Sequence, residues 1–131
     1  MKSLFTVMLL ITGSLTVFAQ TQSDLNKKAA EEYKAADKEL NNIYQQIMKD
    51  YTANKTFTGN LRDAQRLWVQ FRDAQVKTMF PDPAKNYGSA FPMCKSNYLT
   101  ELTHQRAEAL RVWLNGMTQG DICSGSVGAK Q

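Results

Sequence analysis

The stretch LTELTHQRAEALRVW, residues 99–113, places one arginine inside an apolar helical stripe. Its apolar side chains recur every three or four residues, which is the spacing of one face of an α-helix. At about 100° per residue, Arg106 falls close to the direction of Leu102, Leu110 and Trp113. An arginine is rarely buried without a partner. We therefore expect a carboxylate from another helix to meet Arg106.

Two further segments with the same spacing precede this one, and turn residues separate the three. We expect helices over residues 25–51, 61–79 and 95–115, with a break at 54–60, and no stretch alternates like a strand. The sequence thus predicts an all-α fold, an antiparallel three-helix bundle with a long first helix. The inward-facing positions predicted on the first two helices are Ala29, Tyr33, Ala36, Leu40, Ile43 or Tyr44, Ile47 and Tyr51, then Leu61, Ala64, Trp68, Phe71, Gln75 and Met79.

The first nineteen residues read as an export signal rather than as part of the fold. Lys2 supplies a positive start, residues 4–18 form a short apolar segment, and Val17-Phe18-Ala19 is a small-residue cleavage site before Gln20. The apolar segment is shorter than the roughly 20 residues that a membrane span needs. We expect a signal peptide over residues 1–19 and a single domain over 20–131, exported to the periplasm or secreted, without a stable membrane anchor. An uncleaved anchor is the alternative.

Charge and cysteine content restrict the possible partners. The formal net charge of +4 at pH 7, which falls by one when Lys2 is removed, is too small to indicate a dedicated nucleic-acid binder. The sequence contains two cysteines, Cys94 and Cys123. In an oxidising compartment such a pair most simply forms a disulfide, which here would tether the C-terminal tail. Free or intermolecular thiols are the alternative.

Helical projection also brings charged residues together. Arg72 lies on the inward flank of the second helix, and Asp37 borders the apolar stripe of the first. Counting from the two loops places both near the height of Arg106, so we expect a structural ion-pair cluster of Asp37, Arg72, Asp73 and Arg106, with Asn41 beside it. A catalytic use of this cluster would need a cleft and a second titrating group, which the sequence does not supply.

Signals for catalysis are missing from the sequence. His104 is the only histidine, and it projects away from Arg106. The chain has no metal-ligand spacing, no nucleophile elbow and no glycine-rich phosphate loop. We therefore assign no catalytic, metal or cofactor residues and expect no cofactor. The loop from Pro81 to Met93, with its prolines and polar side chains, is the best candidate for an interaction surface.

Several short motifs follow one another along the chain: ADKELN at 36–41, Tyr44, AQRLW at 64–68, FRDA at 71–74, and Leu102-Thr103 with Arg106. In this order they resemble the LprI-type lysozyme-inhibitor family, a family of small exported bacterial helical domains whose namesake inhibits lysozyme. PMC at 92–94 and GDICSGS at 120–126 resemble one subgroup of that family.

This resemblance implies a binding protein whose leading partner is a lysozyme-type glycoside hydrolase. The hypothesis that follows places the 81–93 loop in the lysozyme cleft, with Lys85 near the catalytic carboxylates, Tyr87 as an aromatic anchor, and Asn86 and Ser89 as polar contacts. A plain connecting loop is the alternative at this site. The alternative function is a structural or stress protein of the envelope that binds another envelope component. The sequence does not indicate the oligomeric state.

Overall fold

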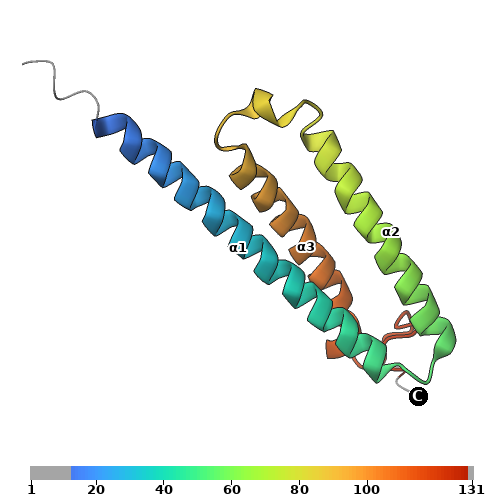
Figure 1. Ribbon diagram of the computed structural model, residues 1–131. Coiled ribbons are helices and arrows are strands. Elements are labelled where there is room, and N and C mark those ends of the chain that lie inside the picture. Colours follow the sequence, from blue (N-terminus) through green and yellow to red (C-terminus); the bar gives the residue numbers. More distant parts are fainter. Residues whose placement is uncertain (1–12, 130–131) are drawn as a thin grey trace, which may run out of the picture.

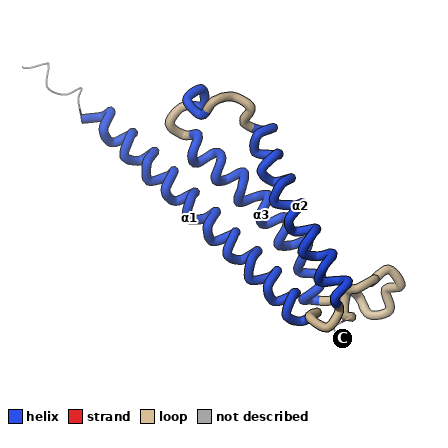
Figure 2. Tube along the Cα trace, turned by 45° about the vertical axis from the view of Figure 1, so that its right-hand side comes forward, coloured by secondary structure: helices blue, strands red, loops and turns tan. Residues whose placement is uncertain are grey.

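Three long helices dominate residues 13–129, the part of the chain that the computed structural model describes (Figure 1). They are α1 (Gly13–Asp50), α2 (Lys55–Met79) and α3 (Phe91–Asn115), and a short 3-10 helix, η1 (Ala84–Tyr87), lies between α2 and α3. No strand occurs among these residues, so the predicted all-α class and helical bundle are confirmed. In both views α1 and α3 run in the same direction, and α2 returns antiparallel to them (Figures 1 and 2).

Helix α1 begins well before the start predicted at Leu25. Residues 14–24 contain neither proline nor glycine, so nothing in that stretch ends the helix. The last part of the predicted signal peptide, residues 13–19, therefore forms the first turns of α1, while residues 1–12 lie outside the described part. Within residues 13–129, no helix combines the length and the apolar character needed to cross a membrane.

The main core lies between α1 and α3. Leu40, Ile47 and Leu110 are almost fully buried there, and Ala107 gives the two helices room for close approach. Thr103 is also fully buried, and its hydroxyl donates to the carbonyl of Leu99 over 2.7 Å, which satisfies the polar group within its own helix. The stripe predicted for the first helix is thus the one that the structure buries.

Helix α2 buries only part of the predicted stripe: Leu61 is buried and Trp68 packs against the core, as predicted. Leu61 and Val76 are its buried apolar residues, whereas Leu67 and Phe71 are 59% and 56% exposed. Ala64 is exposed as well. The predicted inward positions Ala64, Phe71 and Met79 are therefore wrong. At 100° per residue, Ala64 and Phe71 turn away from the buried line through Leu61 and Val76. Met79 projects in the direction of Leu61, but it is the last residue of the helix and is 51% exposed.

Local signals set the ends of α2 and α3. The Asn54 side chain accepts a hydrogen bond from the Phe57 amide and caps α2, so the helix begins at Lys55, inside the break predicted at 54–60. Helix α3 begins at Phe91, with a proline in its first turn, rather than at residue 95. It ends at Asn115, and Gly116, which follows it as the C-cap, has a φ of 81°, a value readily adopted by glycine alone.

The C-terminal tail folds under the end of the bundle where α1 and α3 finish. The Trp113 indole N–H donates to Ser126 Oγ over 3.0 Å. Tyr51, fully buried at the end of α1, donates from its hydroxyl to the Trp113 carbonyl and accepts from the Gly128 amide over 2.9 Å. The Tyr51 ring also contacts Phe57, so aromatic packing and hydrogen bonds hold the tail in place.

The predicted disulfide is absent, which corrects the expectation of a tethered tail. Cys94 and Cys123 are both exposed and unpaired. Cys94 lies in the first turn of α3, whereas the tail that carries Cys123 is anchored at the other end of that helix. The helix between them spans roughly 30 Å, while a disulfide requires Cα atoms about 4.4 to 6.8 Å apart.

Replacing Cys123 by serine should therefore leave the stability nearly unchanged. We expect a change of less than about 0.5 kcal/mol in the free energy of unfolding, as for other exposed positions. Urea denaturation of the air-oxidised protein and its variant measures this difference. A bridge to Cys94 would close a loop of about 30 residues, and a loss of about 3 to 4 kcal/mol on its removal would contradict the structure.

Candidate functional site

The loop between α2 and α3 forms one tip of the molecule (Figure 1). Four aromatic rings brace its backbone, and Phe80 contacts each of the other three. The Tyr87 ring stacks on Phe91 at 5.1 Å between centroids, and Phe80 meets Tyr87, Phe91 and Tyr98 edge-on at 5.5, 5.3 and 6.3 Å. Aromatic pairs at such distances are attractive beyond their buried area. The loop is thus held in one shape by its own side chains.

The four loop residues predicted as partner contacts have different roles in this arrangement. Lys85 and Asn86 are exposed on η1. Within residues 13–129, their side chains make no hydrogen bond or ion pair to the three long helices. Tyr87 is half-buried and its hydroxyl accepts from the Asp82 amide over 2.8 Å, so it supports the loop instead of presenting a free aromatic anchor. The Ser89 carbonyl accepts from Asn26 Nδ2 over 2.9 Å, which ties the loop to α1.

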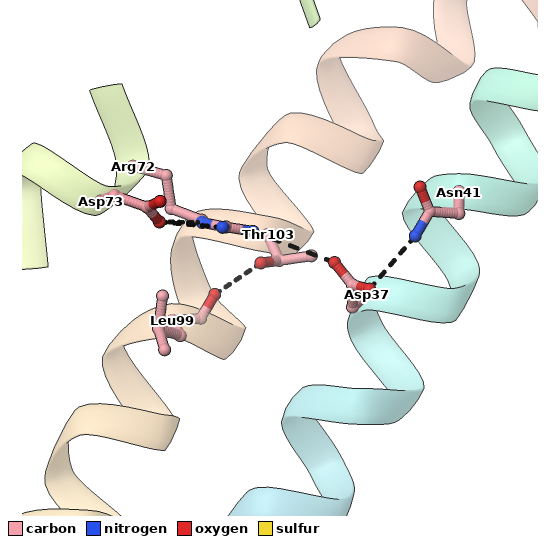
Figure 3. Close-up of polar contacts among 6 residues, drawn as sticks. All are labelled: Asp37, Asn41, Arg72, Asp73, Leu99 and Thr103. Carbon is pink, nitrogen blue, oxygen red and sulfur yellow. Dashed lines mark hydrogen bonds and ion pairs between the residues drawn. The ribbon is translucent and has the colours of Figure 1, made fainter. Parts of the chain in front are cut away.

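A second group of polar residues surrounds Arg72 in the middle of the bundle (Figure 3). The Arg72 guanidinium donates to Asp73 Oδ1 from Nε at 2.9 Å and from Nη2 at 2.8 Å, and its Nη1 lies 3.9 Å from Asp37 Oδ1. Asn41 donates to the other Asp37 oxygen over 3.1 Å. Figure 3 shows the guanidinium passing beside Thr103 of α3 to reach α1. This cluster connects the outer helix α2 to α1.

Arg72 is the buried member of the cluster. Its side chain is 13% exposed and its guanidinium carbon lies 5.4 Å from the centre of the Trp68 ring, while both carboxylates are about half exposed. Burial raises the pKa of neighbouring Tyr33; Arg72 opposes this rise, and Asp37 and Asp73 reinforce it. A tyrosine with a raised pKa stays protonated near neutral pH, so it offers no base for catalysis.

Replacing Arg72 by methionine should destabilise the fold moderately. We expect a loss of about 2 kcal/mol, less than the 3 to 5 kcal/mol typical of a fully buried pair, because water can solvate the two carboxylates that remain. Arg66→Met is the matched control, since Arg66 is 69% exposed and pairs with Asp63 on the same helix. Exposed pairs contribute about 0 to 1 kcal/mol. Equal losses for the two variants in urea denaturation would contradict the structural role of Arg72.

Arg106 does not join this cluster, and the carboxylate expected beside it is absent. Its Nε donates to the neutral Gln65 Oε1 over 3.0 Å. No Asp or Glu among residues 13–129 lies within 4.0 Å of its guanidinium. The reason is register: Gln65 precedes Arg72 by about two helical turns, roughly 10 Å, so Arg106 lies too far along the bundle to reach Asp37.

A third polar group, which the sequence analysis did not predict, connects α1 to α3. The Arg111 guanidinium bonds to Glu39 of α1 and, over 2.7 Å, to Glu108 one turn earlier in α3. The hydrogen bond to Glu108, together with the charges of Glu108 and Glu39, raises the pKa of Arg111 against the opposing effect of burial. His104 lies 3.7 Å from Glu39. The three-residue spacing of Glu108 and Arg111 was the available signal, but the contact across helices depends on their packing.

The described residues include a cavity but no metal site. The cavity, of about 420 Å³, opens between α2, α3 and the tail, and it borders Arg106. Within residues 13–129, no group of three or more His, Cys, Asp or Glu could hold a metal ion.

Comparison with known proteins places the chain in a family. The family model described as "Lysozyme inhibitor LprI" matches residues 17–110. A protein of Rhizobium meliloti (strain 1021), itself described as uncharacterized, is 35% identical over 104 residues, which cover 71% of this chain and 73% of the relative. No solved structure matches significantly. The chain belongs to the LprI lysozyme inhibitor family.

Proposed function

We propose that this protein is an exported inhibitor that binds a lysozyme through the tip loop. Membership in the LprI family supports the partner class. The observation that carries the choice of surface is the ring cluster under η1, which fixes the loop while leaving Lys85 and Asn86 exposed. A loop already held in its binding shape loses little conformational entropy on association.

The chemistry of the loop suits the chemistry of a lysozyme cleft. Glycoside hydrolases of this class place two carboxyl groups on either side of the bond that they cleave. The ammonium group of Lys85 could approach these carboxylates, and the amide of Asn86 could replace hydrogen bonds that a sugar makes. Such a contact would block substrate and would need no catalytic residue in the inhibitor.

Net charge supports a short-range mode of binding. Without residues 1–19, and thus without Lys2, the chain carries a formal net charge of +3, and many lysozymes are themselves basic. Two proteins of like net charge gain no long-range electrostatic steering. At physiological ionic strength, charges further apart than about 8 Å are largely screened. Local pairing of Lys85 with cleft carboxylates therefore remains available despite the unfavourable net charges.

Export completes this proposal. Residues 1–19 carry the features of a signal peptide, and we propose cleavage before Gln20. Cleavage would shorten α1 at its free amino-terminal end and leave Asn26, which holds the loop, in place. The mature protein would then act in the periplasm or outside the cell, where it can meet lysozymes.

A second candidate function rests on the outer face of α2. Leu67 and Phe71 lie one turn apart on this face, and both are more than half exposed. Exposed apolar side chains at neighbouring positions favour contact with another protein. This face supports the alternative of an envelope protein that binds a different envelope component.

Titration of the mature protein against a panel of lysozymes, of animal and bacterial origin, tests the proposed function. The readouts are lysis of cell-wall substrate and direct binding by calorimetry. Saturable inhibition of at least one lysozyme with matching 1:1 binding is the expected result. Absence of binding across the whole panel would overturn the proposal and favour the envelope alternative.

A further inference from the structure

The cavity beside Arg106 has the dimensions of a small-molecule site. Its volume of about 420 Å³ lies within the range of roughly 300 to 1,000 Å³ that ligand pockets occupy. The first turns of α2 form one wall, the second half of α3 forms the other, and the tail contributes Ser126. The residues lining it include Phe57, Leu61, Arg106, Leu110, Trp113 and Ser126.

The walls of the cavity are mainly apolar. Phe57 and Trp113 lie with their ring centres 5.9 Å apart, and Leu61 and Leu110 belong to the hydrophobic core behind them. The polar lining groups are uncharged apart from Arg106. An occupant with a hydrocarbon body would therefore bury apolar surface here, at about 25 cal/mol for each Å² removed from water.

Arg106 supplies the positive charge of the cavity. Gln65 uses one of the five N–H donors of the guanidinium, and this neutral amide orients the group without cancelling its charge. Burial lowers the pKa of Arg106, but the ordinary value is so high that arginine stays protonated in proteins. Arg72 and Arg111 are also partly buried, but carboxylates balance their charges, because each of them contacts two. Arg106 is thus a charged group with donors left for an anion.

The geometry points to a binding site for a small amphipathic carboxylate, with its carboxylate on Arg106 and its hydrocarbon chain between Leu61, Leu110 and Trp113. A planar guanidinium fork matches the two oxygens of a carboxylate. One arginine balances one carboxylate, whereas a doubly charged phosphate monoester would leave excess negative charge beside apolar walls. This site lies at the opposite end of α2 from the tip loop, so it is independent of the proposed lysozyme contact.

Calorimetry with monomeric decanoate tests the site, and decanol serves as the uncharged counterpart. We expect saturable 1:1 binding of decanoate and at least tenfold weaker binding of decanol. Arg106→Gln should weaken decanoate binding at least tenfold, whereas Arg66→Gln, which removes the same charge from the exposed side of α2, should leave it unchanged. No decanoate binding by the wild-type protein, or equal weakening by both variants, would overturn the proposal.

A second readout does not depend on the stability of the Arg106 variant. In the wild-type protein, the indole N–H of Trp113 donates to Ser126 at the edge of the cavity, so its NMR resonance reports on occupancy. Decanoate should shift this resonance in a saturable way, with the same dissociation constant that calorimetry gives. Shifts confined to the exposed face around Leu67 and Phe71, with Trp113 unmoved, would show non-specific adsorption and contradict the site.

Discussion

Replacing Leu40 by alanine should lower the free energy of unfolding by about 3 to 4 kcal/mol, within the range known for large-to-small changes in protein cores. Leu40 is 1% exposed and packs in the cluster that joins α1 to α3. Removal of its side chain leaves a cavity that the two helices cannot fill, because Ile43, Ile47 and Ala107 already pack around it. For a domain of this size, the loss is a large fraction of the usual total of about 5 to 15 kcal/mol.

Leu67→Ala is the matched control for this prediction. It removes the same atoms from α2, but Leu67 is 59% exposed, so we expect a change within about 0.5 kcal/mol. Urea denaturation followed by circular dichroism measures both variants. Losses of similar size at the two positions would mean that the outer face of α2 is buried in solution, and would contradict the packing described for this helix.

Replacing Lys85 by glutamate should weaken inhibition of a susceptible lysozyme at least thirtyfold, equivalent to about 2 kcal/mol. The variant would place a negative charge where the proposed complex has two carboxylates. Lys85 is exposed on η1, so the fold should not change. The inhibition constant from cell-wall lysis and the melting temperature together separate lost contact from lost structure.

Lys38→Glu controls for the change in net charge. Lys38 is exposed on α1, away from the tip, and its reversal alters the total charge by the same amount. Because many lysozymes are basic, a general charge effect would strengthen binding of both variants. Equal inhibition by the Lys38 and Lys85 variants would show that the tip does not enter the cleft.

The inward stripe of α1 could be predicted from sequence because only one face of that helix is apolar. Ala36, Leu40 and Ile47 recur at helical spacing, and the structure buries all three. Helix α2 carries two partly apolar stripes, one through Leu61 and Trp68 and the other through Leu67 and Phe71. Periodicity cannot choose between two such stripes, since the choice depends on how the helix packs against its neighbours.

The charged residues show a second limit, which is register. Helical projection gives the direction of a side chain but not its height relative to another helix. Arg106 and Arg72 lie about two helical turns, roughly 10 Å, apart along the bundle, and the sequence does not show this offset. The disulfide predicted between Cys94 and Cys123 shows the same limit, because the sequence does not give the path of the tail relative to α3. The structure pairs Arg106 with Gln65 and anchors the tail at Trp113 instead.

The tip loop has some features that the sequence predicts and others that it does not. Its prolines and glycine predict an exposed connection, and Lys85 and Asn86 are indeed exposed. The brace under it could not be predicted, because Phe80, Tyr87 and Tyr98 come from a helix end, η1 and α3 and meet only through the fold of the loop. Tyr87 therefore resembles a surface anchor in sequence and acts as part of the support in the structure.

Competition with a substrate-like sugar tests most directly whether the tip loop occupies a lysozyme cleft. The experiment measures binding of the mature protein to a susceptible lysozyme at increasing concentrations of a chitin oligosaccharide that fills the cleft. If Lys85 and Asn86 enter the cleft, the apparent Kd must rise in proportion to the oligosaccharide concentration. An apparent Kd that stays constant while the cleft is full would contradict this, because inhibitor and sugar would then bind at separate places.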